Sequence, residues 1–253
     1  MQALDLDEIR THVNQNIATF HQTKLNKIST LRLNDILKRK NPYLFKAKNI
    51  NIAADLVRDI LDAYLYASEE KMFGDFLENL AIFVAKRACG GVKSSATGID
   101  LEIDRDNTRF LISIKSGPNW GNNSQKEKLR QDFEKAQRTL MQSSHISNVQ
   151  PVLGICYGKA KRTFIKNHTK LEGQEFWTFI SGNRNLYIEI IEPVGYEAKR
   201  HNDDFLAKKG EVINKFTKEF MDEFCTEEGQ IDWAKLVKFN SGNLELTPAH
   251  SPS

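Results

Sequence analysis

The sequence predicts a mixed α/β protein, of the α+β kind, in which helices pack on a central mixed β-sheet. Three observations lead to this prediction. Apolar residues recur at helical spacing through residues 1–70 and again over 203–239. Between residues 98 and 115 the period changes to two, as in paired strands. A short apolar segment at 151–158 is typical of a strand that is buried on both faces.

The helical spacing of apolar residues predicts helices over most of the chain. Within residues 1–70, apolar positions such as Ile9, Val13 and Ile17 lie one helical turn apart. We expect one helix within 51–70. A second helix is expected over 69–88, since Ser68 can cap its start and Gly90-Gly91 can terminate it. The second helix is apolar around much of its circumference, which predicts a central position. Further helices are expected over 124–142 and 203–239, and the last dozen residues are expected to form a loose tail.

The strands are expected in three places. "GIDLEID" and "RFLISIK" flank the turn sequence "RDNT" and predict an antiparallel hairpin. The segment "PVLGICYG" predicts the buried strand, and "NLYIEIIEPV", residues 185–194, predicts another. If the hairpin closes through residues 105–108, Asp104 lies opposite Arg109 and Asp100 lies opposite Ser113. Asp100, Ser113 and Lys115 then share one face at the end away from the turn.

A carboxylate and an ammonium group at one strand end suit the hydrolysis of phosphodiesters. The carboxylate can bind Mg²⁺, and the lysine can position or deprotonate a water molecule or offset charge on the phosphoryl group. The competing interpretation is a solvent-exposed strand face with a lysine that protects the sheet edge. Gly98 before the hairpin and the sequence "GPNWG" after Lys115 favour the first interpretation, because backbone can approach a ligand closely there.

Composition sets broad limits on the function. The chain has 253 residues, 40% hydrophobic and 27% charged, with a formal net charge of +3, which allows a nucleic-acid partner without requiring one. Its three cysteines show no CxxC spacing, which argues against a disulfide framework or a zinc site. No apolar run approaches the roughly 18 residues needed to cross a bilayer, and no signal-peptide pattern is present. We therefore expect a cytoplasmic protein that does not associate with a membrane.

The segments "TGIDLEID" and "FLISIKSG" resemble the active-site hairpin of the PD-(D/E)xK nuclease superfamily, and "IKSGPNWGN" resembles its type II restriction endonucleases. The resemblance extends over most of the chain beyond residue 68, and it is nearest to enzymes that cut interrupted GG-N-CC-type palindromes. It implies a restriction-endonuclease-like core at 68–198, between a helical region at 1–67 for packing or dimerisation and a C-terminal helical region with a tail at 199–253. It further implies a Mg²⁺-dependent bacterial enzyme that cleaves double-stranded DNA as a homodimer, with a cognate DNA methyltransferase as functional partner.

Carried over residue by residue, the first acid of the motif falls on Asp100 and the lysine on Lys115. Ile99 stands where the motif has a proline, which takes no part in catalysis. Ser113 stands where the motif has its second carboxylate. The resemblance therefore places Ser113 in the catalytic site, but its hydroxyl lacks the negative charge of a metal ligand. Three acids are candidates to complete the metal site, in the order Glu78, Glu127, Glu102. Glu78 has an exposed helix face as its competing interpretation, and Glu127 forms a possible capping box with Ser124.

Contacts to DNA are expected from loops near the hairpin and from basic segments. The loop after Lys115 and the helix N-terminus at Ser124 can supply backbone N–H groups to a phosphate. The side chains expected to contact DNA are Asn119, Trp120, Asn122, Lys161, Arg162, Lys166, Arg184, Lys199 and Arg200. Trp120 has a second possible role, that of wedging its loop against the core. Two other functions remain open from the sequence: a repair or nicking nuclease on the same core, and a catalytically inactive DNA-binding relative, for which Ser113 is the main argument.

Overall fold

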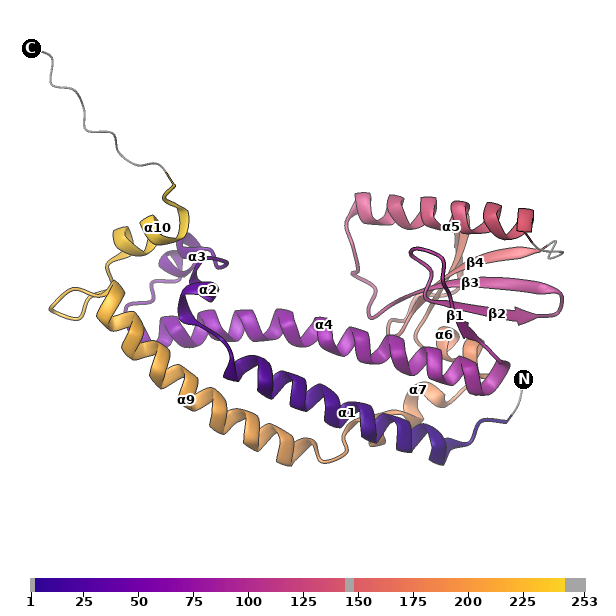
Figure 1. Ribbon diagram of the computed structural model, residues 1–253, viewed down its shortest axis with the longest axis horizontal. Coiled ribbons are helices and arrows are strands. Elements are labelled where there is room, and N and C mark those ends of the chain that lie inside the picture. Colours follow the sequence, from indigo (N-terminus) through magenta and orange to yellow (C-terminus); the bar gives the residue numbers. More distant parts are fainter. Residues whose placement is uncertain (1–2, 144–147, 244–253) are drawn as a thin grey trace, which may run out of the picture. The chain divides into compact units, whose positions relative to one another are not determined.

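The computed structural model describes residues 3–143 and 148–243, and it confirms a mixed α/β protein with helical N- and C-terminal segments (Figure 1). The helices are α1 (Leu6–Ser29), α2 (Leu33–Leu37), α3 (Pro42–Ala47), α4 (Ala53–Cys89), α5 (Asn123–Ser143), α6 (Gln174–Ser181), α7 (Leu186–Glu189), α8 (Ile191–Val194), α9 (Ala198–Phe224) and α10 (Trp233–Ser241). The strands are β1 (Val92–Lys93), β2 (Leu101–Arg105), β3 (Thr108–Lys115), β4 (Val149–Ile155), β5 (Thr163–Ile165) and β6 (His168–Glu172). The predicted tail from residue 244 onward lies outside the described residues.

The chain divides into two compact units. The first comprises the chain up to His21 and Glu70–Ala198, and it contains the whole sheet together with every residue predicted to be catalytic. The second comprises Gln22–Glu69 and the chain from Lys199 onward. It has its own apolar core, which is built around α9 residues such as Phe216, Phe220 and Phe224.

The described strands form one mixed sheet in the order β1-β2-β3-β4-β6-β5. The β2–β3 hairpin pairs Asp104 with Arg109, which confirms the predicted register. Its two-residue turn, Asp106-Asn107, has positive φ angles of 48° and 57°, a conformation that Asp and Asn tolerate better than most residues. Strand β4 runs parallel to β3 and pairs Ile155 with Lys115. The C-terminal ends of β3 and β4 therefore lie side by side, and the loops that follow the two strands begin there.

Helices cover both faces of this sheet, as Figure 1 shows within the first unit. On one face, Leu101, Ile103 and Ile112 pack in a cluster with residues of α4 and α6. On the other face, Leu111 and Leu153 pack in a separate cluster with residues of α5. Since residues 101 and 103 lie on the α4 face, the alternating Asp100, Glu102 and Asp104 belong to the α5 face. This alternation places Asp100 on the same side as Ser113 and Lys115, as predicted.

The prediction of a helix start at Ser68 is wrong, because α4 runs without interruption from Ala53 to Cys89. Ser68 lies inside the helix, and its hydroxyl accepts a hydrogen bond of 2.5 Å from Lys27 Nζ. No glycine or proline stands near residue 68 to break the helix, so a capping-type residue alone does not begin a new one. The predicted end is confirmed, since Gly90 takes a φ of 69° and Gly91 N donates to Ala85 O at 3.0 Å.

The strand predicted at 185–194 is also wrong, because this segment forms the short helices α7 and α8. Leu186 and Ile190 are both buried, and a separation of four residues places them on one helical face. The hairpin of β5 and β6 was not predicted. Its sequence is polar and basic, and its turn at Lys166 has a φ of 54°, so the hydrophobic pattern that marks a buried strand is weak there.

The helix predicted over 203–239 is two helices in the structure. Between α9 and α10, Cys225 and Ile231 form an isolated antiparallel bridge. Helix α10 then begins at a local cap, in which Asp232 Oδ1 accepts a hydrogen bond of 2.9 Å from Lys235 N.

Candidate active site

The predicted aspartate and lysine meet at the open end of the β2–β3 hairpin. Asp100 directly precedes β2, and Lys115 is the last residue of β3. Asp100 Oδ2 accepts hydrogen bonds from Ile114 N at 2.6 Å and from Ser113 Oγ at 3.2 Å, and it lies 3.9 Å from Lys115 Nζ. All three contacts use the same carboxylate oxygen. Among the described residues, no hydrogen bond or ion pair engages Asp100 Oδ1, which is therefore available to a ligand.

Lys115 is held in place by two further contacts. Its ammonium donates to Ile114 O at 2.9 Å, and it lies 5.7 Å from the centroid of the Trp120 ring. Trp120 is partly buried and packs against the α5-side core, which ties the loop after β3 to the sheet. The lysine side chain is about one third exposed, so a substrate could reach it.

Ser113 has no exposed surface. Its hydroxyl donates to Asp100, and its neighbour Ile114 supplies the shorter backbone hydrogen bond to the same oxygen. In this arrangement Ser113 orients the aspartate and adds no charge to the site.

Glu78 is half-buried on α4, and it is electrostatically coupled to the hairpin residues. Burial raises the pKa of Glu78, and the negative charge of Asp100 raises it further, whereas Lys115 and Lys93 act in the opposite direction. Glu78 in turn contributes, after burial itself, to raising the pKa of the Cys156 thiol to about 12. Cys156 is therefore an uncharged neighbour of the site at neutral pH.

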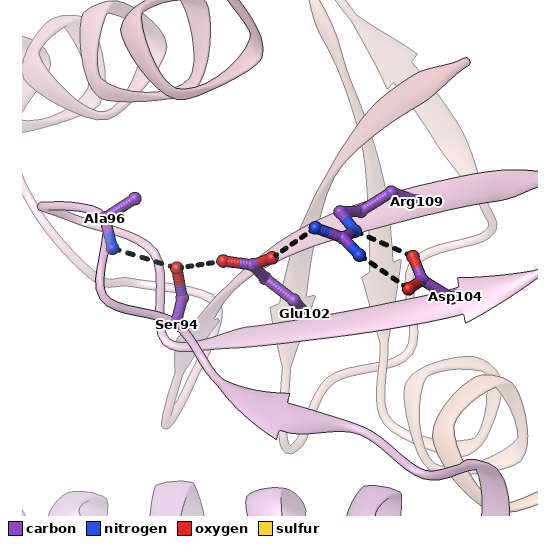
Figure 2. A network of polar contacts seen from close by, with 5 residues as sticks. All are labelled: Ser94, Ala96, Glu102, Asp104 and Arg109. Carbon is purple, nitrogen blue, oxygen red and sulfur yellow. Dashed lines mark hydrogen bonds and ion pairs between the residues drawn. The ribbon is translucent and has the colours of Figure 1, made fainter. Parts of the chain in front are cut away.

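Glu102 is engaged in a polar network on the α5 face of the hairpin (Figure 2). Its Oε1 accepts a hydrogen bond of 2.7 Å from Ser94 Oγ, and its Oε2 lies 3.5 Å from Arg109 Nη1. Arg109 also donates two hydrogen bonds of 2.7 Å to Asp104, and these lower the pKa of that carboxyl group. Both oxygens of Glu102 thus have partners, Ser94 after β1 and Arg109 on β3, which favours a structural role over a role as metal ligand.

Glu127 lies on the exposed side of α5 and forms an ion pair with Arg130. The expected capping box of Ser124 and Glu127 is wrong, because Asn122 and Gln125 form the equivalent arrangement two residues earlier. Asn122 Oδ1 accepts a hydrogen bond from Gln125 N at 3.0 Å, and Gln125 Oε1 accepts one from Asn122 N at 2.9 Å. Glu127 is therefore not needed as a cap, whereas the carboxyl group of Glu78 is electrostatically coupled to Asp100 and Lys115.

The acids fit a divalent cation that keeps much of its hydration. Across residues 3–143 and 148–243, no three His, Cys, Asp or Glu side chains gather closely enough to enclose a metal ion. Mg²⁺ is commonly bound by one or two carboxylates, with water and substrate phosphate completing its coordination. Asp100, with its free Oδ1, and Glu78 match that limited set of donors.

The residues predicted to contact DNA lie in several places. Asn119 and Asn122 are exposed in the loop after Lys115, although Asn122 also caps α5. Lys161 and Arg162 are exposed on the segment after β4, Lys166 forms the β5–β6 turn, and Arg184 follows α6. Lys199 and Arg200 belong to the second unit, where Lys199 pairs with Asp203 at 2.8 Å.

Backbone contacts connect the loop after β4 to the loop after β3. Cys156 N donates to Lys115 O at 2.9 Å, and Tyr157 N donates to Ser116 O at 3.2 Å. Farther along, the buried Glu172 accepts a hydrogen bond of 2.9 Å from Ala160 N and pairs with Lys170 at 2.6 Å. Glu172 was not singled out from the sequence, and it holds the segment that leads to Lys161 and Arg162.

The mixed sheet and its flanking helices fit the restriction-endonuclease-like fold. A family model for type II restriction endonuclease EcoO109I matches residues 7–202, and the chain belongs to that family. It is accordingly a site-specific deoxyribonuclease whose substrate is double-stranded DNA. No curated protein matches the chain significantly. Within the described part of the chain, no helix has the length and apolar character needed to cross a membrane.

Proposed function

We propose that this protein is a Mg²⁺-dependent type II restriction endonuclease of the PD-(D/E)xK superfamily, and that it hydrolyses both strands of duplex DNA at a short palindrome. The observation that supports the proposal is the approach of Asp100 and Lys115 at the open end of the hairpin, 3.9 Å apart, together with the electrostatic coupling of Glu78 to both. Type II restriction endonucleases generally use Mg²⁺. An interrupted GG-N-CC-type site is the specific recognition sequence that we propose.

Asp100 and Glu78 are the residues that would hold Mg²⁺. The ion, when bound, supplies Lewis-acid chemistry to a phosphoryl oxygen and makes a water molecule more acidic. The hydrogen bonds from Ile114 and Ser113 fix the orientation of the Asp100 carboxylate and leave its other oxygen to face the ligand. Ser113 therefore takes over the positioning part of the missing second carboxylate, and Glu78 takes over its charge.

Lys115 handles the attacking water or the phosphate in this proposal. Its ammonium lies 3.9 Å from Asp100 Oδ2 and is fixed by Ile114 O, so its charge is held where negative charge develops on the phosphoryl group. A rigid placement matters, because uncatalysed phosphodiester hydrolysis is so slow that the site must lower the barrier by on the order of 20 kcal/mol.

The DNA backbone would follow the edge of the sheet where β3 and β4 end. The loop with Asn119, Trp120 and Asn122 and the segment with Lys161 and Arg162 both begin at this edge, and backbone hydrogen bonds join them there. We propose Lys166 and Arg184 as further contacts on the first unit, and Lys199 and Arg200 as contacts made by the second.

We further propose that the enzyme acts as a homodimer in the bacterial cytoplasm and that a cognate DNA methyltransferase protects the host's sites. A palindrome is read most simply by a two-fold symmetric dimer with one active site for each strand. The second unit carries strongly exposed apolar side chains, Tyr43 and Leu44 on α3 and Ile52 just before α4, which support a role in assembly.

The test is incubation of the protein with plasmid DNA in Mg²⁺, with EDTA and Ca²⁺ as parallel conditions. We expect discrete double-strand fragments in Mg²⁺ alone, and sequencing of the fragment ends gives the recognition site and the stagger. Open circles without linear DNA would instead identify a nicking nuclease. Tight DNA binding without cleavage in either Mg²⁺ or Mn²⁺ would identify an inactive relative. Light scattering with and without DNA tests the dimer.

A further inference from the structure

The short edge strand β1 brings a second lysine to the candidate active site. Lys93 is exposed and ends the two-residue strand, which pairs with β2 at the edge of the sheet. The next residue is tied directly to the site, because Ser94 N donates to Asp100 O at 3.3 Å. The backbone of β1 therefore fixes Lys93 one strand away from Asp100, on the side opposite β3.

The register decides on which face of the sheet Lys93 projects. Lys93 pairs with Leu101, and residues directly opposite each other in an antiparallel pair project to the same face. Leu101 is fully buried in the cluster that contains α4 residues, and Glu78 also belongs to α4. Lys93 thus lies on the α4 face, whereas Lys115 lies on the α5 face. The two lysines approach the same strand end from opposite sides of the sheet.

The ammonium of Lys93 is not neutralised by a neighbour. Within the described residues it forms neither a hydrogen bond nor an ion pair, although many other lysines are paired with acids in this protein. Its charge nevertheless acts on Glu78 in the same direction as that of Lys115. A lysine that has no hydrogen-bonded or ion-paired acceptor can contact a phosphate, because a phosphodiester oxygen supplies the missing acceptor.

We propose that Lys93 is a second phosphate-binding lysine of the catalytic centre, which contacts a non-bridging oxygen of the DNA backbone from the α4 face while Lys115 acts from the α5 face. This inference rests on the proposed nuclease function and adds a residue to its site. The alternative is a lysine that only protects the edge strand from pairing with another sheet.

The experiment compares Lys93→Ala, Lys93→Gln and Lys93→Arg with the wild type in Ca²⁺, using a short DNA duplex of arbitrary sequence and a series of NaCl concentrations. Lys86→Ala is the matched control, since Lys86 is an exposed lysine near the C-terminal end of α4 and its replacement removes the same charge. Thermal unfolding of each variant verifies the fold. The Gln variant keeps a long polar side chain in case the Ala variant disturbs the edge strand.

We expect Lys93→Ala and Lys93→Gln to bind DNA roughly tenfold more weakly at low salt. The slope of log K against log salt should become shallower by about 0.9, as for one lost phosphate contact. Lys93→Arg should restore the slope, and Lys86→Ala should leave it unchanged. Folded Lys93→Ala and Lys93→Gln variants with the slope and affinity of the wild type would overturn the inference, as would an equal loss in Lys86→Ala.

These outcomes are separable from failure of the proposed function. Binding in Ca²⁺ does not require cleavage, so the slopes report on Lys93 alone. Failure of the wild type to cut plasmid DNA in Mg²⁺ would instead bear on the nuclease proposal.

Discussion

Replacement of Asp100 by Asn tests the centre of the proposed site with the least change in shape. Asp100 Oδ2 accepts the hydrogen bonds from Ile114 N at 2.6 Å and Ser113 Oγ at 3.2 Å. An asparagine oxygen can still accept both, but it carries no charge. A hydrogen bond to a charged group contributes about 1.5–3 kcal/mol and one between neutral groups about 0.5–1.5 kcal/mol, so the expected loss of stability is about 1 kcal/mol. For a chain of this size that corresponds to a fall in Tm of about 2–4 °C.

The effect on catalysis should be much larger than the effect on stability. Asp100→Asn removes one of the two carboxylate charges that would hold Mg²⁺ in the proposed site, and it breaks the attraction to Lys115 across 3.9 Å. Charge stabilisation by a bound metal amounts to several kcal/mol, so a loss of about 4 kcal/mol, or roughly a thousandfold in rate, is the minimum that we expect.

The assay is single-turnover cleavage of duplex DNA in Mg²⁺, combined with thermal unfolding and with DNA binding in Ca²⁺. Asp104→Asn is the matched control. It makes the same chemical change on the same face of β2, near the turn, where the aspartate pairs with Arg109. We expect Asp104→Asn to cut DNA at nearly the wild-type rate. A cleavage rate for Asp100→Asn within tenfold of the wild type would refute the assignment, and global unfolding of this variant would show that Asp100 is needed for the fold.

Further predictions concern three residues around the proposed site. Because burial raises the pKa of Glu78 and its ionised form is needed to hold the cation, cleavage should decline on acidification at a higher pH than an ordinary glutamate would cause, as a pH–rate profile can show. In the absence of metal, stability should fall as the pH rises through that raised pKa, and Glu78→Gln should remove the decline in a pH series of unfolding curves. Glu172→Ala should lower the free energy of unfolding by about 3 kcal/mol in a denaturant titration, because it leaves Lys170 and Ala160 N without their buried acceptor. A loss below about 1 kcal/mol would contradict the importance of that contact. Gly98→Ala should destabilise the protein by at least about 1 kcal/mol and slow cleavage. The reason is that Gly98 has a φ of 78° and that an added Cβ would lie 2.6 Å from Asp132 Oδ2. Unfolding and cleavage curves of this variant that match those of the wild type would refute the prediction.

Some sequence-based predictions depended on contacts that the sequence does not reveal. The hairpin at 163–172 lacks a strong apolar alternation, and it joins the sheet through β6, which pairs in parallel with β4, while β5 pairs with β6 alone. The segment 185–194 has the composition of a strand, but its buried residues Leu186 and Ile190 follow helical spacing against the α4-side core. Glu102 and Glu127 were reasonable candidate ligands from the sequence, and only the side-chain positions show that Arg109 and Arg130 pair with them.

The sequence by itself determined the hairpin, its register and the shared face of Asp100, Ser113 and Lys115. These features depend on alternation within two adjacent strands and on a two-residue turn, all of which are local. The tertiary structure decided which other groups join them. Glu78 lies on α4, whose residues pack against one face of the sheet, and Lys93 lies on a strand whose face is set by pairing with β2; both are members of the site that we propose. Such approaches are fixed by the packing of segments that are separate in the chain, and a one-dimensional pattern of residues carries no direct record of that packing.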